Sequence, residues 1–231
     1  MSLRAALPIL PALAFATAFP TSSGGAQPEA ACSESNREGC RAARGDRRVK
    51  TWRQVATEDD RRRLREWRDA FVAALAEARG SGHGDLIARE GVLLDPDAAL
   101  PRAALPQGEF HCRTIKLGSQ REGGLDYVAY PGFRCRAGPG AGGLTLFAKL
   151  TGSQRPVGRL FPEHDRRQIF LGTMQLSDER QVLTYGRDRE RNMAGILERI
   201  GERRWRILFP YPHFESTLDV IELTYLPSER S

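Results

Sequence analysis

From Glu109 onward, the chain is a series of short segments rich in Val, Ile, Phe, Tyr and Thr, punctuated by Gly and Pro. The segments are short and evenly spaced, and turns of hairpin length such as residues 201–203 separate them. This texture is typical of an antiparallel meander, and the absence of long crossover helices argues against a parallel sheet. The predicted strands are Phe110–Leu117, Tyr127–Arg136, Leu144–Thr151, Val157–Phe161, Gln168–Leu176, Val182–Tyr185, Met193–Ile200, Arg204–Phe209 and Asp219–Leu226.

The residues before these strands predict helices. Thr57 is suited to an N-cap, and the acidic residues 58–60 follow it, where a helix dipole favours negative charge. An apolar stripe at helical spacing continues to a stop at Gly80–Gly82, and a second, shorter helix is predicted over Asp85–Leu94. The stripe consists of Leu64, Trp67, Phe71 and Leu75.

Together these patterns predict an α+β protein in which an N-terminal helical segment packs on an antiparallel sheet of about eight strands. A barrel resembling the lipocalins is the favoured form, and a β-sandwich is the alternative. We expect one domain over residues 51–231, helical over 51–100 and antiparallel β over 109–227.

The N-terminus has the order of a secretory signal peptide. One positive charge in Met1–Arg4 precedes the apolar run Ala5–Phe19, and small residues follow. The run is too short for a bilayer span, which takes about 20 residues. We therefore expect a cleaved signal peptide over residues 1–26, a flexible arm over 27–50, and a periplasmic or secreted protein.

Export changes the interpretation of the four cysteines, because an oxidising compartment favours disulfides. The most local of the three possible pairings joins Cys32 to Cys40 and Cys112 to Cys135. If Cys112 and Cys135 face each other directly on adjacent strands, the hairpin centre falls at Gly123-Gly124, a preferred turn pair. Alternatively, residues 118–126 form one long loop and the cysteines join the strands in a shifted register. Lipidation of Cys32 is not favoured, because the preceding residues make a poor lipobox.

The formal net charge is +6, and nearly all the positive charge is arginine, since the chain has only three lysines. Arginines and acids are interleaved, which is typical of a solvated surface rather than a nucleic-acid site. We expect no nucleic-acid partner, and contact with an anionic membrane surface stays open. Arg155 and Arg159 are candidates for binding an anion.

Five aromatic residues could line a barrel interior and contact an apolar ligand, or could equally form a plain core. They are Tyr127, Tyr130, Phe133, Phe147 and Trp205.

No pattern of catalytic or metal-binding residues stands out. The four histidines do not have metal-ligand spacing, and no nucleophile-elbow motif occurs. We therefore expect no cofactor and no metal. An envelope hydrolase with a site assembled from dispersed residues, around His111 or His213, is the alternative hypothesis.

Several segments resemble a family of exported bacterial proteins known as domain of unknown function 4893, seen mostly in sphingomonad-type alphaproteobacteria. The resemblance spans Trp52 to Leu226 and implies an envelope location and a shared fold, but it brings no activity, cofactor or catalytic residue. Our preferred hypothesis is therefore that the protein is a non-enzymatic envelope module that binds a small apolar ligand or a protein partner. The matching segments are Trp52–Phe71, Phe110–Ser119, Tyr127–Arg136, Phe147–Pro162, Gln168–Gly172, Gly195–Ser216 and Leu218–Leu223.

Overall fold

The computed structural model describes residues 50–227 apart from 131 and 178. The predicted signal peptide and the Cys32–Cys40 pair lie outside the described residues. Among the residues described, no helix has the length and apolar character needed to cross a membrane.

The N-terminal helices occur where the sequence predicts them. Thr57 accepts a hydrogen bond from the Asp60 backbone N–H, which confirms it as an N-cap. The long predicted helix is interrupted at Glu66, which lies between two helices rather than inside one. The helical elements are α2 (Trp52–Val55), α3 (Glu58–Arg65), α4 (Trp67–Gly80), α5 (Gly84–Glu90) and the 3₁₀ turn η2 (Gly91–Leu94).

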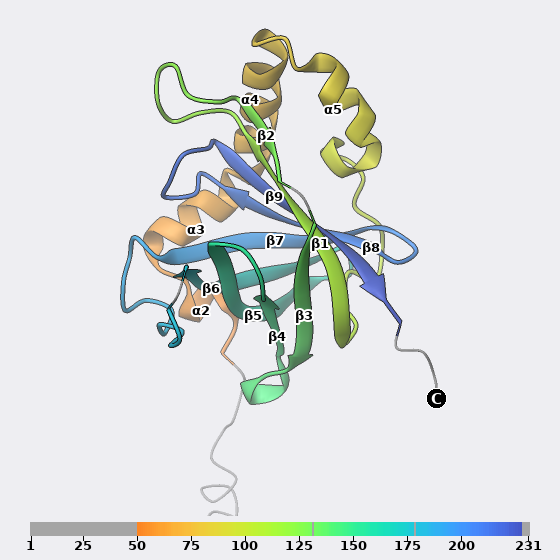
Figure 1. The fold of residues 1–231 in the computed structure, drawn as a ribbon. Helices are drawn as coiled ribbons and strands as arrows, with labels where there is room; N and C mark the ends of the chain where they lie inside the picture. The colour runs from red at the N-terminus through yellow and green to blue at the C-terminus, as the bar shows by residue number, and fades with distance from the viewer. Residues whose placement is uncertain (1–49, 131, 178, 228–231) are drawn as a thin grey trace, which may run out of the picture. The chain divides into compact units, whose positions relative to one another are not determined.

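The nine strands form one antiparallel sheet in the order β2-β1-β3-β4-β5-β6-β7-β8-β9. An additional pairing of β1 with β9 closes eight of them into a barrel, with β2 outside the ring (Figure 1). This confirms the barrel over the β-sandwich. The strands are β1 (Gly108–Leu117), β2 (Tyr127–Ala129), β3 (Phe133–Pro139), β4 (Thr145–Lys149), β5 (Gln154–His164), β6 (Arg167–Leu176), β7 (Asn192–Gly201), β8 (Arg204–Pro210) and β9 (Leu218–Leu226).

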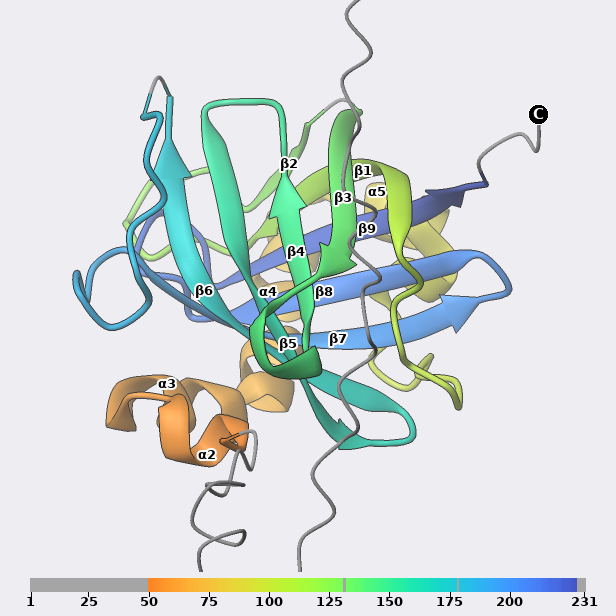
Figure 2. The same cartoon turned by 90° about the horizontal axis from the view of Figure 1, so that it is seen from below.

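Successive side chains of each strand point to opposite faces of the sheet, and this alternation produces two separate apolar cores. On β1, Phe110 and Cys112 belong to the core inside the barrel, whereas Ile115 and Leu117 belong to the core between barrel and helices. Helix α4 contributes Phe71 and Leu75 to the second core. The helices contact β1, β7, β8 and β9, and Arg53 of α2 also pairs with Glu163 on β5. Figure 2 shows α2 and α3 beside one another, outside the strands of the barrel.

A buried ion pair joins the helical side to the barrel wall. Arg206 and Glu198 are both fully buried, and Arg206 Nη2 lies 2.7 Å from Glu198 Oε2. The same guanidinium donates to the backbone carbonyls of Leu93 and Asp95, at 2.8 and 2.7 Å. Its donors therefore also satisfy carbonyls at the end of the helical segment, where no helical partner remains.

The predicted disulfide between Cys112 and Cys135 is confirmed, with the Cα atoms 6.0 Å apart. The direct pairing is wrong, however, because Cys112 is opposite Phe133 and Cys135 is opposite Phe110. The bond is diagonal across β1 and β3, which agrees with the shifted register. Residues 118–126 form a loop closed by a 2.9 Å bond from the Gly118 N–H to the Asp126 carbonyl.

Two predicted strands differ from the structure. The segment Tyr127–Arg136 is divided into β2, which ends at Ala129, and β3, which begins at Phe133. The sequence between them contains a proline, a residue type that cannot donate to a strand ladder. The segment Val182–Tyr185 is not a strand, since it lies in the loop between β6 and β7. Tyr185 is instead turned toward helix α3, where its hydroxyl donates to the Asp60 carboxylate.

Candidate functional site

One end of the barrel interior is filled by aromatic side chains. Phe170 makes edge-to-face contacts with Phe147 and Phe209, at centroid distances of 6.1 and 5.4 Å. Phe110 and Trp205 make a similar contact at 6.1 Å. This edge-to-face geometry is favourable for packed aromatic rings.

The other end of the barrel contains a cavity of about 510 Å³. Side chains from the inward face of the strands line it, mostly at the strand ends that meet at this mouth. The lining residues are Thr114, Lys116, Tyr130, Phe133, Lys149, Gly152, Ser153, Gln154, Pro156, Met174, Met193, Phe209, Glu215, Asp219 and Ile221. The lining therefore combines an apolar wall with two lysines and two carboxylates.

Strand alternation explains why these lysines point inward. Lys116 is six residues after Phe110 on β1, and Lys149 is two residues after Phe147 on β4, so each shares the face of a core aromatic. Lys116 is opposite Asp219 in the β1–β9 register, which brings their side chains together inside the barrel.

Lys116 has its charge balanced by two carboxylates. Its Nζ lies 2.8 Å from Glu215 and 3.4 Å from Asp219. Burial alone would lower the pKa of Lys116, but the two carboxylates outweigh burial and the net pKa is raised. Burial raises the pKa of Asp219 against the opposing effect of Lys116.

Lys149 has a different environment. Its ammonium donates to the Gln154 carbonyl at 2.8 Å and lies 3.6 Å from the centre of the Phe133 ring. Gly152, at φ +90°, allows the backbone to approach closely, since an added Cβ would lie 2.9 Å from Lys149 Nζ. Burial, and then the charges of Arg155 and Lys116, lower the pKa of Lys149 to about 8.

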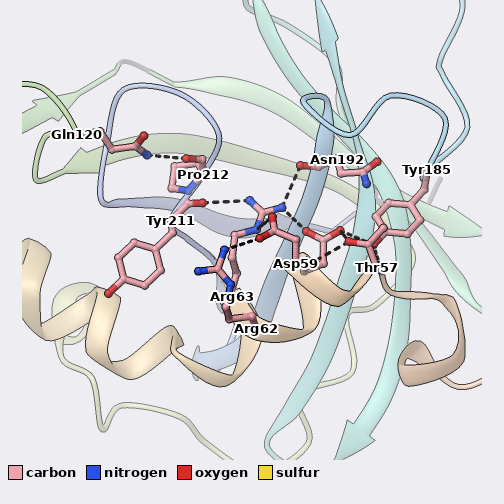
Figure 3. A network of polar contacts seen from close by, with 10 residues as sticks. Thr57, Asp59, Arg62, Arg63, Gln120, Tyr185, Asn192, Tyr211 and Pro212 are labelled. Carbon is pink, nitrogen blue, oxygen red and sulfur yellow. Dashed lines mark hydrogen bonds and ion pairs between the residues drawn. The ribbon is translucent and has the colours of Figure 1, made fainter.

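The loop between β8 and β9 carries Glu215 to the cavity and is held on two sides. Gln120 donates to the carbonyls of Pro212 and Ser216, at 2.6 and 2.7 Å. From helix α3, Arg63 donates to the Tyr211 carbonyl at 3.1 Å (Figure 3). These contacts fix the loop relative to both the loop that follows β1 and the helices.

Arg63 in turn belongs to a buried network at the start of α3 (Figure 3). It pairs with Asp60, and the two side chains are only 5% and 1% exposed. Thr57 and Tyr185 both donate hydroxyl hydrogen bonds to the same Asp60 carboxylate. These contacts surround the Asp60 carboxylate with donors and link α3 to the β6–β7 loop, although Arg63 Nε has no hydrogen-bond partner among the described residues.

The predicted ligand-lining aromatic residues are separated by the fold. Tyr130 and Phe133 line the cavity, whereas Phe147 and Trp205 are buried in the barrel core. Tyr127 lies with the helices, where its hydroxyl donates to Glu90 at 3.0 Å.

The two candidate anion-binding arginines lie on the same face of β5, since they are four residues apart on the strand. Arg155 donates to backbone carbonyls, including that of Gly152 at 3.1 Å and that of Glu179 at 3.2 Å. Arg159 lies 6.0 Å from the Phe161 ring. The guanidinium of Arg155 therefore ties the neighbouring turns together.

The histidines named for the hydrolase hypothesis lie apart. His111 is exposed on β1. His213 lines a second cavity of about 590 Å³ beside α3, and burial followed by the charge of Arg63 lowers its pKa. Across the described chain, His213 has no hydrogen bond to an acid or a hydroxyl, and the nearby Thr57 hydroxyl donates to Asp60. This cavity therefore contains no assembled pair of nucleophile and base.

Among the lining residues, the sequence interpretation named only Tyr130 and Phe133. It missed the others, including all the charged ones and Thr114. Strand alternation could have identified those that lie on strands. A polar residue an even number of positions from a core aromatic residue on the same strand also points inward. No group of three or more metal-ligating side chains is present within the described ranges.

A family model described as Domain of unknown function (DUF4893) matches residues 52–223. The chain belongs to this family. The match covers helices α2–α5 and the barrel strands through most of β9, so the residues that line the cavity are within it. No curated protein and no solved structure matched the chain.

Proposed function

We propose that this DUF4893 protein is an exported, non-enzymatic module that binds a small, largely apolar ligand in the barrel cavity. The observation that carries the proposal is the cavity itself. Its volume of about 510 Å³ is within the range of roughly 300–1,000 Å³ that small-molecule sites occupy.

The wall of the cavity suits an apolar molecule. Met174 and Met193 extend into it from β6 and β7, beside Phe209 and Ile221. Methionine side chains are unbranched and polarizable, so they adapt to ligands of irregular shape. The opposite end of the barrel is closed by aromatic packing, so the ligand enters and leaves at the mouth beside the β8–β9 loop.

Two features support export. The order of residues at the N-terminus is that of a signal peptide, and the Cys112–Cys135 disulfide suits an oxidising compartment.

Native mass spectrometry tests the proposal on protein purified from the envelope fraction of its own host. We expect extra mass that leaves on denaturation. Met193→Trp places an indole in the cavity and should abolish the adduct. Val72→Trp is the matched control, because Val72 is 52% exposed on α4.

The same proteins should be titrated with dodecanol and dodecanoate. Binding by the wild type and by Val72→Trp, with loss in a folded Met193→Trp variant, supports the cavity as the site. A folded wild-type protein that carries no adduct and binds neither probe would contradict the proposal and favour a protein partner instead.

A further inference from the structure

Lys149 is a buried ammonium to which no described residue supplies a counter-charge. Its side chain is in the cavity lining and the residue is 5% exposed. An ammonium has three donors, and only the bond to the Gln154 carbonyl is made among the described residues. Nor does any described carboxylate oxygen lie within 4.0 Å of it. A buried charge in this state is costly unless a partner supplies the missing contacts.

The groups around Lys149 do not supply that partner. Lys116 and Arg155 are positive, and the carboxylates of Glu215 and Asp219 pair with Lys116. The contact with Phe133 provides some attraction to the ring face but no acceptor for the remaining donors.

Thr114 provides a second, independent sign of a missing ligand. Its hydroxyl oxygen is buried and has no hydrogen-bond partner among the described residues. Thr114 lines the same cavity, two residues before Lys116 on β1. Buried hydroxyl groups are normally paired, so an acceptor in the cavity would satisfy this one.

The polar groups and the apolar wall together define the chemistry of the ligand. An acceptor-rich anionic head would satisfy Lys149 and Thr114, while an alkyl body would contact Met174, Met193 and Ile221. A single ammonium and one hydroxyl match a monoanion better than a phosphate, which has more acceptor oxygens to satisfy.

We propose that the cavity binds an amphiphilic carboxylate of the fatty-acid type, whose head pairs with Lys149 and accepts a hydrogen bond from Thr114. This inference rests on the proposed function, since it names the class of the ligand held in the barrel.

Calorimetric titration of the folded protein with dodecanoate and dodecanol tests the inference, because the two probes share an alkyl chain and differ in the head. We expect dodecanoate to bind the wild type roughly 10- to 100-fold more tightly, as for a hydrogen bond to a charged group. Lys149→Met should remove this preference and retain dodecanol binding. Thr114→Val should weaken dodecanoate by a smaller factor.

Lys50→Met is the matched control, because Lys50 is exposed and lies outside the barrel. Equal affinity of the wild type for the two probes would overturn the inference while leaving the proposed function intact. Failure of both probes to bind a folded protein that also carries no adduct would instead contradict the proposed function. The wild-type comparison needs no variant, so it decides the inference even where Lys149→Met does not fold.

Discussion

The ammonium of Lys149 lies 3.6 Å from the centre of the Phe133 ring, and the two side chains reach each other from neighbouring strands β4 and β3. The pair places a cation inside a barrel beside an apolar wall. The energetic cost of burying this charge, rather than any catalytic arrangement, distinguishes the cavity from the end of the barrel that aromatic side chains occupy.

Binding of dodecanoate should depend on pH. The pKa of Lys149 is lowered to about 8, so the free protein carries this charge below pH 8 and loses it above. Affinity should be level below pH 8 and then fall by up to tenfold per pH unit, until the higher pKa of the bound state is reached.

Other charges that face Lys149 also affect this profile. Lys116 on β1 and Arg155 on β5 disfavour its protonation, while Asp219 on β9 and Glu215 in the β8–β9 loop pair with Lys116. Calorimetry from pH 6.5 to 9.5 would measure the profile. A wild-type profile as flat as that of Lys149→Met would contradict the assignment of Lys149.

Lys149→Met should stabilise the ligand-free protein near pH 7. The substitution removes a buried, unbalanced cation and keeps the side-chain volume, so a gain of about 1–2 kcal/mol is expected. The folded-state pKa is below the unfolded value of 10.5, so the unfolded chain binds more protons between pH 8 and 10.5. Wild-type stability therefore rises with pH in that window, and the advantage of the variant shrinks. Urea denaturation at pH 7 and 9.5 measures both effects, with Lys50→Met as control.

Arg206→Met should destabilise the protein by about 3–5 kcal/mol, because it leaves Glu198 buried with one arginine partner fewer. The double variant Arg206→Met/Glu198→Met removes both charges and should lose less stability than the single one. Urea denaturation of the two variants checks the order, and a double variant that loses more stability than Arg206→Met would argue against an energetic coupling between the two residues.

Arg63→Met should loosen the β8–β9 loop as well as destabilise α3. It removes the hydrogen bond to the Tyr211 carbonyl and leaves the buried Asp60 carboxylate without its cation. We expect faster hydrogen exchange over residues 211–217 and a stability loss of about 3 kcal/mol. Arg62→Met is the control, since Arg62 is 58% exposed and pairs with Asp59 at the surface. Unchanged exchange in the loop would show that the bond from Arg63 is not needed to hold it.

Replacing both Cys112 and Cys135 by alanine should lower stability by about 3 kcal/mol, the value expected for a loop of 23 residues. Thermal denaturation of the oxidised wild type and the variant would measure the loss. A reduced wild type as stable as the oxidised protein would contradict this expectation.

Much of the fold can be predicted from the sequence because strand alternation and helix caps are local signals. Thr57 begins a helix as predicted, and the segments Met193–Ile200 and Arg204–Phe209 are strands joined by a short turn. The segment Val182–Tyr185 has strand-forming residues but no neighbouring strand to pair with. The tertiary contacts of Tyr185 decide the conformation of this segment. Strand propensity, which depends on residue type, does not include such contacts.

The site was harder to predict because it depends on barrel closure. Lys116 and Asp219 are opposite each other only through the β1–β9 pairing, which joins the two ends of the β region. The prediction that Cys112 and Cys135 are directly opposite each other was wrong for a related reason. Symmetry about Gly123-Gly124 assumes one simple hairpin, whereas β2 occupies the strand segment nearest the turn and β3 pairs further along β1.

The diagonal disulfide also bears on the order in which the barrel assembles. The β1–β3 pair is local in sequence, so it can form and be oxidised early, whereas the β1–β9 seam needs a long loop closure that slows folding. Cys112 is opposite Leu223 in the β1–β9 pairing. The disulfide is therefore attached to β1, the strand with which β9 pairs to close the barrel. An early disulfide would present β1 as a prepared template, so that the cavity and its charged pair form in the final step of folding.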